Sequence, residues 1–175
     1  MYACWARSMA EAMTVQPLTK DSFAPFGDVV EFEGRDFFPI NDGMADRYHA
    51  LADVDLAGEQ ARAIISLVAS RQFDMPRRVD HLEHHPLGSQ AFLPLDASPF
   101  IVVVCPAAEE PDLGQLRAFV TNGKQGINYH LGTWHHVLLT PYAPMRFICL
   151  DRAGPGHNCI DHHIPETDQP LLQVD

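Results

Sequence analysis

The sequence is short of basic residues: 12 Lys and Arg stand against 23 Asp and Glu, and the formal net charge is −11. Proteins bind a phosphate backbone mainly through basic side chains, so this shortage argues against nucleic acid as a partner. A small anionic substrate is compatible with such a chain only where a local cation or a set of backbone N–H groups holds it.

Long apolar runs and paired cysteines are also missing. No window approaches the roughly 20 apolar residues that a membrane span needs, and the opening MYACWARSMAEA has no signal-like apolar core, so we expect a soluble protein with no membrane partner. The four cysteines form no C-x-x-C pair, and Cys105 and Cys149 lie inside apolar runs. Unpaired, buried cysteines favour a reducing, cytoplasmic compartment.

Helical patterns are scarce, whereas 14 prolines and 11 glycines divide the chain into short segments rich in β-branched and aromatic residues. The segments that we expect to be strands are 27–32, 63–70, 90–95, 100–104, 116–121, 134–139 and 145–150. Many short strands between turns predict an antiparallel sandwich or barrel. Two short helices are expected, one after a Thr19 cap and one over residues 53–63. The length suits a single domain, which we place at 13–175 with residues 1–12 as an extension.

The first chemistry-bearing segment is RVDHLEHHPLGSQAFLPL. If residues 79–85 are extended, His81, Glu83 and His85 share one face of the strand, with successive members about 7 Å apart. Imidazole and carboxylate ligands together suit a borderline divalent metal such as Zn, Ni, Mn or Fe. The ordinary alternative is a set of partly buried or loop histidines beside one more surface acid.

The second segment is NYHLGTWHHVLL, in which Gly132 provides a turn. Alternation along the strand that follows places Trp134 and His136 on one face and His135 on the other. One histidine is therefore expected to face the interior and the other the outside or an interface. The sequence leaves open which one faces inward, and a core histidine beside a buried Trp is the ordinary alternative.

Together these two segments resemble the two-motif barrel of the cupin superfamily, in which a Gly-x-x-His after a turn supplies a metal ligand. The ordered set RDFFPINDGMADRYH, LEHHPLGSQAF, PDLGQLRAFVTNGKQGINYHLGTWHH and the ending DR with a Gly-rich tail is similar to the ureidoglycolate lyase family, formerly called ureidoglycolate hydrolases. The first motif departs from metal-tight cupins because Gln90 stands where a carboxylate is expected, so it does not establish tight metal binding.

The resemblance implies a mainly β cupin-type antiparallel, jelly-roll-like barrel with a few short helices, usually a homodimer. It implies release of urea from (S)-ureidoglycolate to leave glyoxylate, in allantoin and purine degradation, with nickel or another divalent metal assisting and no organic cofactor. This chemistry needs a base for the hydroxyl, an acid for the departing nitrogen and donors for the carboxylate, and no nucleophile. The candidate catalytic residues are Glu83, His85, His135 and His136, and the candidate metal ligands are His81, Glu83, His85 and His135.

For substrate binding, Arg47 is the first candidate, because a guanidinium can hold a carboxylate through two hydrogen bonds. A surface ion pair with Asp42 or Asp46 is its alternative role. The further candidates for substrate contacts are Gln90, Asn128, Tyr129 and His130. Two other functions stay open: an amidohydrolase that releases ammonia and carbon dioxide, and a non-catalytic cupin that binds a small molecule through an apolar mouth.

Overall fold

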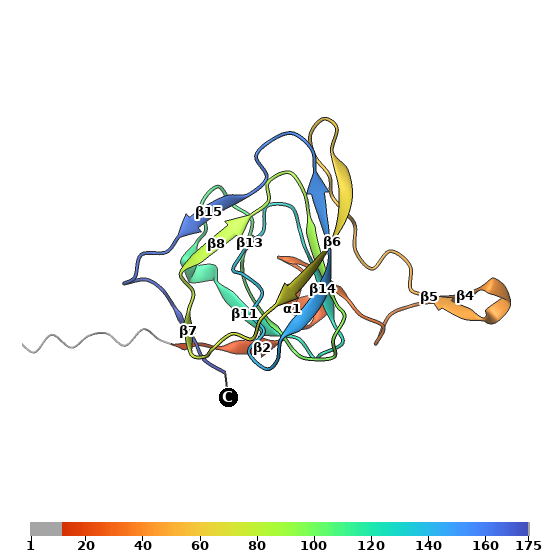
Figure 1. Cartoon of the computed structure of the whole chain (residues 1–175), viewed down its shortest axis with the longest axis horizontal. Coiled ribbons are helices and arrows are strands. Elements are labelled where there is room, and N and C mark those ends of the chain that lie inside the picture. Colours follow the sequence, from red (N-terminus) through yellow and green to blue (C-terminus); the bar gives the residue numbers. More distant parts are fainter. Residues whose placement is uncertain (1–11, 175) are drawn as a thin grey trace, which may run out of the picture.

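The computed structural model describes residues 12–174, and nearly all of its regular structure is β-strand (Figure 1). Two large sheets form the body of the molecule, one of six strands and one of five. A small three-stranded sheet and a two-stranded hairpin complete the strand structure. The predicted mainly β, cupin-like architecture is confirmed, with the strands of residues 12–174 divided among separate sheets and not joined in one closed barrel.

The six-stranded sheet carries both histidine-bearing segments, in the order β15-β8-β13-β10-β11-β2. Its strands are β2 (Val15–Pro17), β8 (His81–His84), β10 (Ile101–Cys105), β11 (Arg117–Val120), β13 (Trp134–His135) and β15 (Ile160–His163). All neighbours are antiparallel except β11 and β2. β8 therefore lies between β15 from the C-terminal tail and β13 from the second motif.

The five-stranded sheet has the order β3-β12-β9-β14-β6, and every neighbouring pair is antiparallel. Its strands are β3 (Gly27–Val30), β6 (Arg62–Ser70), β9 (Gln90–Pro94), β12 (Gly126–Tyr129) and β14 (Met145–Ala153). β6 and β14 are the longest strands, and β6 forms one edge of this sheet.

The remaining elements are short. The three-stranded sheet contains β1 (Ala12–Met13), β16 (Leu171–Leu172) and β7 (Arg77–Arg78), and the hairpin pairs β4 (Phe38–Ile40) with β5 (Ala45–Arg47). The helices are α1 (Lys20–Phe23) and the 3-10 turns η1 (Asn41–Gly43) and η2 (Leu113–Gln115). Figure 1 shows the β4–β5 hairpin projecting from the body, well away from β8 and β13.

Two apolar clusters stabilise this arrangement, because strand β10 is buried on both of its faces. Val102 and Val104 face the five-stranded sheet and pack in a cluster with Tyr129 and Phe147. Val103 and its same-face neighbours belong to a second cluster on the opposite side, which includes Leu172 of the small sheet. A strand that is covered on both faces typically has an uninterrupted apolar sequence, and the sequence of β10, IVVVC, is of this kind.

All seven segments expected to be strands contain strand, although only residues 134 and 135 of 134–139 do. The Thr19 cap is also confirmed, since its side-chain oxygen accepts the N–H of Ser22 at the start of α1. The helix expected over 53–63 is wrong. That stretch contains turns and an isolated bridge between Leu56 and Gly88, and β6 begins at Arg62.

At the N-terminus, Ala12 pairs with Leu171 in β1, while residues 1–11 of the expected extension lie outside the described residues. Over residues 12–174, no helix has the length and apolar character to cross a bilayer. The three cysteines in this range, Cys105, Cys149 and Cys159, are free.

Candidate active site

The pairing of β8 with β13 brings the two histidine-bearing segments together. His135 is the direct cross-strand partner of Glu83. Beyond the end of β8, the N–H of Gly132 donates to the carbonyl of His85 at 3.0 Å. Gly132 has φ +79°, a conformation that glycine adopts without strain, so this residue allows the turn that closes the two segments on each other.

Glu83, His85 and His135 form what we call the Glu83 cluster. A carboxylate oxygen of Glu83 and one ring nitrogen from each histidine lie within 4.8 Å of one another. The His85 and His135 rings are 5.3 Å apart between centroids, and His135 Nδ1 is 3.8 Å from Glu83 Oε1. The predicted alternation along β8 is confirmed, because His81 and Glu83 are half-buried whereas Leu82 and His84 are buried.

Backbone carbonyls orient both imidazoles of the Glu83 cluster. His85 Nδ1 donates to the carbonyl of Asn158 at 2.6 Å, and His135 Nδ1 donates to that of His136 at 3.2 Å. A carbonyl can only accept, so each ring carries its proton on Nδ1 and a lone pair on Nε2. Both Nε2 atoms are buried and have no hydrogen-bond partner within residues 12–174.

Burial keeps the His135 ring and the Tyr129 hydroxyl uncharged. Loss of hydration, together with the neighbouring His85, lowers the pKa of His135 to about 3. Burial and the nearby Glu83 carboxylate raise the pKa of the Tyr129 hydroxyl above its ordinary value. At neutral pH His135 is therefore a neutral acceptor and Tyr129 a neutral donor.

Two substrate-contact candidates from the five-stranded sheet reach this site. Tyr129 on β12 stacks on the His135 ring with centroids 4.3 Å apart, and its hydroxyl has no partner among the described groups. Gln90 on β9 is the cross-strand partner of Tyr129, so both side chains lie on the same face. The Gln90 amide donates to Asp151 Oδ2 at 3.3 Å.

The end of β14 and the C-terminal tail add acidic and thiol groups that were not among the candidates from the sequence. Asp151 reaches the site through Gln90, and Asp161 on β15 is the cross-strand partner of Glu83. The Cys159 thiol donates to Glu83 Oε2 at 3.6 Å, and burial raises its pKa to about 11. The available signal was the family-like DR ending followed by the turn-rich polar tail, which marked the segment but not its contacts.

The same tail fixes the position of His85. Besides its carbonyl, Asn158 offers its side-chain Oδ1 to the N–H of Leu87 at 2.8 Å. Arg152 is buried and donates to the carbonyls of Ala57 and Pro155, which holds the loop that precedes Asn158.

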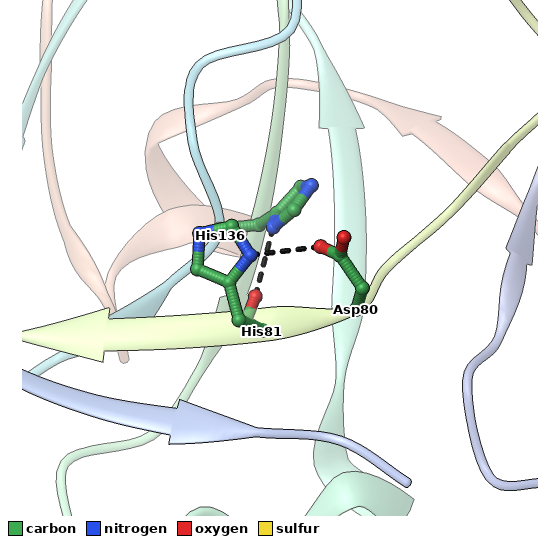
Figure 2. A group of neighbouring side chains, drawn as sticks. All are labelled: Asp80, His81 and His136. Atoms are coloured by element: carbon green, nitrogen blue, oxygen red, sulfur yellow. Dashed lines mark hydrogen bonds and ion pairs between the residues drawn. The ribbon is translucent and has the colours of Figure 1, made fainter. Parts of the chain in front are cut away.

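His81 and His136 form a different group with Asp80, which we call the Asp80 cluster (Figure 2). His81 Nδ1 is 2.8 Å from Asp80 Oδ1, and His136 Nδ1 donates to the His81 carbonyl at 2.8 Å. The structure thus divides the predicted metal ligands, because it places His81 away from Glu83, His85 and His135. The expectation that His135 or His136 faces outward is wrong: both are buried, because regular alternation ends with β13 at His135 while the chain continues beside β10.

Trp134, which directly precedes His135 and His136, anchors β13 to the rest of the sheet. Its indole N–H donates to the Ala108 carbonyl at 3.0 Å, and its ring stacks on the buried His84 imidazole with centroids 4.0 Å apart. His84 therefore fits the ordinary explanation of a packed core histidine.

The other substrate-contact candidates lie elsewhere. Arg47 is on the projecting β4–β5 hairpin (Figure 1) and is exposed. The Asn128 amide donates to Asp28 Oδ2 and the Asp53 carbonyl, each at 3.0 Å. His130 pairs with Asp28 at 3.3 Å and lines a separate cavity of about 370 Å³. None of these three contacts the Glu83 cluster.

Comparison with known proteins shows which family this chain belongs to. The sequence profile of the family described as ureidoglycolate lyase matches residues 10–170. The chain belongs to the ureidoglycolate lyase family. Relatives named ureidoglycolate lyase include that of Pseudomonas paraeruginosa strain PA7, which is 51% identical over 91% of this chain and 95% of its own length. That of Stutzerimonas stutzeri is 51% identical over 91% and 94%, and that of Pseudomonas syringae pv. tomato is 48% identical over the same shares.

Membership of the ureidoglycolate lyase family confirms the resemblance drawn from the two motifs. The matched region includes every residue of the Glu83 and Asp80 clusters as well as Asp151 on β14 and Asn158 in the tail. The chain is thus an enzyme of the type that this family represents.

Proposed function

We propose that this protein is a carbon–nitrogen lyase that releases urea from (S)-ureidoglycolate and leaves glyoxylate, with the Glu83 cluster as its active site. Family membership and the relatives' names support the activity. One observation supports the location: a carboxylate and two imidazoles with unpartnered Nε2 atoms meet between the two motifs.

The reaction requires two coordinated proton transfers. The hydroxyl on the substrate's central carbon loses a proton, the bond from that carbon to the urea nitrogen breaks, and the departing nitrogen gains a proton. The hydroxyl oxygen becomes the aldehyde oxygen of glyoxylate. No nucleophile and no water add to carbon, so the site needs a base, an acid and donors for the carboxylate.

Glu83 is assigned as the base that takes the hydroxyl proton, because it is the carboxylate of the cluster and is half-buried. His85 is assigned to relay a proton to the departing nitrogen. Its Nδ1 is held by the Asn158 carbonyl, and the lone pair on its Nε2 first accepts the hydroxyl proton that Glu83 has taken and then passes it to that nitrogen. His135 stays neutral, with its pKa lowered to about 3, and acts as an acceptor beside the substrate. This division gives adjacent groups opposite proton roles.

Donors from the five-stranded sheet orient the substrate. The Tyr129 hydroxyl remains protonated and has no partner within the described chain, so it is a donor for a substrate oxygen. The Gln90 amide, with one donor and one acceptor group, matches the amide end of the substrate. Arg47, Asn128 and His130 are not assigned contacts with a substrate in this site.

The residues of the Glu83 cluster also fit a divalent metal ion. Metal-binding histidines typically donate their second nitrogen to a carbonyl or carboxylate, as His85 and His135 do. As an alternative to the proton-transfer roles above, Glu83, His85 and His135 would hold the ion through these same donor atoms, and their nitrogen and oxygen donors suit nickel or another borderline metal. When bound, the ion supplies positive charge that favours the substrate carboxylate and the developing oxyanion.

The charge around the site supports this part of the proposal. Glu83, Asp151 and Asp161 are all acidic, and in the described part of the chain none of them forms an ion pair with Lys or Arg. An anionic substrate beside these carboxylates is repelled unless a cation offsets their charge.

We further propose a homodimer formed through the outer face of the five-stranded sheet. Ile65 and Leu67 on the edge strand β6 are 74% and 76% exposed. Their cross-strand partners on β14 are Leu150 and Ile148, so the four side chains form one apolar face. An exposed apolar face bounded by a long edge strand favours association. Leu67→Glu is expected to convert the dimer to a monomer in sedimentation or light scattering; a monomeric parent protein would contradict this assignment.

The proposal includes a cytoplasmic location, supported by the free cysteines Cys105, Cys149 and Cys159.

Product analysis tests the reaction. Purified protein is incubated with (S)-ureidoglycolate, and urea, glyoxylate and ammonia are quantified separately. Urea and glyoxylate in equal amounts are expected. Stoichiometric ammonia without urea would instead identify an amidohydrolase, and absence of turnover would favour a binding protein, although the polar Glu83 cluster differs from the apolar mouth expected for that function.

A further inference from the structure

The Asp80 cluster is a second meeting point of potential metal ligands. A carboxylate oxygen of Asp80 and one ring nitrogen each from His81 and His136 lie within 4.8 Å of one another. The His81 and His136 rings are 4.9 Å apart between centroids and inclined at 70°. Figure 2 shows these three side chains gathered beside β8, with the His136 ring approaching from the other segment.

His136 is the least expected member of the cluster, because its side chain is completely buried and only one of its two ring nitrogens has a hydrogen-bond partner within the described residues. Its Nδ1 donates to the His81 carbonyl at 2.8 Å, so its Nε2 carries a lone pair. That Nε2 has no partner within residues 12–174. Buried polar atoms are nearly always bonded, and an unbonded one calls for a ligand, an ion or a water.

The surroundings provide an entrance for such a ligand. The side chains of His81 and Asp80 are 27% and 50% exposed, whereas His136 is buried, so the cluster opens to solvent on one side. His163 on β15 is the cross-strand partner of His81, with ring centroids 6.1 Å apart, and stands beside the opening.

The donor set identifies the chemical class of the ligand. Two imidazoles and one carboxylate suit Zn²⁺, Co²⁺ or Ni²⁺ better than Mg²⁺ or Ca²⁺, which prefer oxygen alone. Tetrahedral zinc with ligand bonds of about 2.0–2.1 Å places its donors roughly 3.3 Å apart. The Asp80–His81 pair is already at 2.8 Å, and all three donor atoms lie within 4.8 Å of one another.

We propose that Asp80, His81 and His136 form a second binding site for a divalent transition metal, separate from the active site. It lies at the start of β8 and beyond the end of β13, so an ion there ties together the same two segments that form the Glu83 cluster. The site has a structural role and does not contact the substrate.

The test uses cobalt as the probe, because Co²⁺ bound to nitrogen and oxygen donors absorbs visible light. Full-length protein is stripped with a chelator and titrated with Co²⁺, and bound metal is counted by elemental analysis after gel filtration. His81→Ala and Asp80→Asn change half-exposed side chains, which avoids disturbing buried His136. Glu83→Gln with His85→Ala is the matched variant for the other cluster.

Two cobalt ions per chain are expected in the parent protein, and one in either set of variants. His81→Ala is expected to weaken binding at the Asp80 cluster by more than about 100-fold, because it removes a direct ligand. Zn²⁺ added to the stripped protein should also shift the ¹⁵N resonance of His136 Nε2, and this shift should be lost in His81→Ala.

The two proposed metal sites can be disproved independently of each other. Cobalt content and spectrum that are unchanged by both His81→Ala and Asp80→Asn would overturn the second site, whatever the Glu83 variants do. One ion per chain that disappears with His81→Ala but persists in the Glu83→Gln, His85→Ala variant would support the second site and exclude a metal at the Glu83 cluster.

Discussion

The Glu83 and Asp80 clusters are built from the same two segments and contain the same residue types, yet their surroundings differ. Each combines one carboxylate with two histidines, one of which is buried. Around the Glu83 cluster, β9, β12, β14 and the tail add Gln90, Tyr129 and Asp151, together with two unpartnered imidazole nitrogens. The capacity for acid–base catalysis therefore depends on what the second sheet and the tail contribute, and not on histidine content alone.

The largest expected difference between the clusters comes from matched carboxylate substitutions. Glu83→Gln removes the proposed base and is expected to lower kcat/KM by about 10²–10⁴-fold, the range for loss of general acid–base catalysis. Asp80→Asn, the matched change in the other cluster, is expected to leave kcat/KM within about threefold. Steady-state urea release measures both. Equal losses in the two variants would remove the distinction on which the site assignment rests.

Tyr129→Phe tests the contribution of the second sheet. It keeps the ring that stacks on His135 and removes only the unpartnered hydroxyl. We expect kcat/KM to fall by about 10–100-fold through loss of a positioned donor. The free energy of unfolding should stay the same or rise, because a buried hydroxyl without a partner is destabilising. Unaltered kinetics would exclude this hydroxyl from substrate binding.

His135 and His136 belong to different clusters, but we expect both to affect the stability of the protein in the same way as the pH changes. The pKa of His135 is lowered to about 3 and that of His136 to about 4, mainly by burial, whereas both titrate near 6.5 in the unfolded chain. Below pH 6.5 the unfolded chain thus binds protons that the folded protein excludes. Each histidine should reduce stability by about 1.4 kcal/mol per pH unit as the pH falls from about 6.5 toward 4.

Chemical denaturation of chelator-treated protein at pH 7, 6 and 5 measures this slope. His135→Gln and His136→Gln should each reduce the slope of stability against pH by about 1.4 kcal/mol per pH unit, the contribution of one proton. Stability that stays constant between pH 7 and 5 would show that neither ring is held neutral by burial.

The smallest effect is expected at Asn158, which supports only the Glu83 cluster. Asn158→Ala removes the side-chain acceptor for Leu87 N–H and loosens the carbonyl that holds His85. We expect kcat to fall about threefold to tenfold with KM little changed, and the His85 tautomer signal in ¹⁵N NMR to broaden. Asn122→Ala is the control, since that side chain bonds Lys124 N–H in an exposed turn. Comparable losses in the two variants would deny Asn158 a specific role.

Local patterns were sufficient to predict most of the fold. Short β-branched segments between prolines and glycines identified the strands, and alternation correctly separated His81 and Glu83 from Leu82 and His84. The helix expected over residues 53–63 failed because its alanines give only a weak preference that tertiary contacts override, and because Gly58 and Gln60 adopt positive φ, which no α-helix contains. The neighbouring strands instead hold this stretch through a bridge from Leu56 to Gly88.

The site was only partly predictable, because its remaining contacts are non-local. Glu83, His85 and His135 follow from two motifs, but no pattern indicates that Asp151 on β14 or Asn158 in the tail comes close to them. The 135/136 ambiguity could not be resolved by alternation either, since β13 ends at His135 and both rings are buried. Arg47 was selected for its guanidinium, whereas the projecting hairpin that carries it could be seen only in three dimensions (Figure 1).

The stacking of Trp134 on His84 has an optical consequence. The indole is the only tryptophan among residues 12–174, is fully enclosed, and directly precedes His135. Its emission should report changes at the junction of β8 and β13, so ligand or ion titrations can be followed without an attached dye, provided that the signal of Trp5 is removed by substitution.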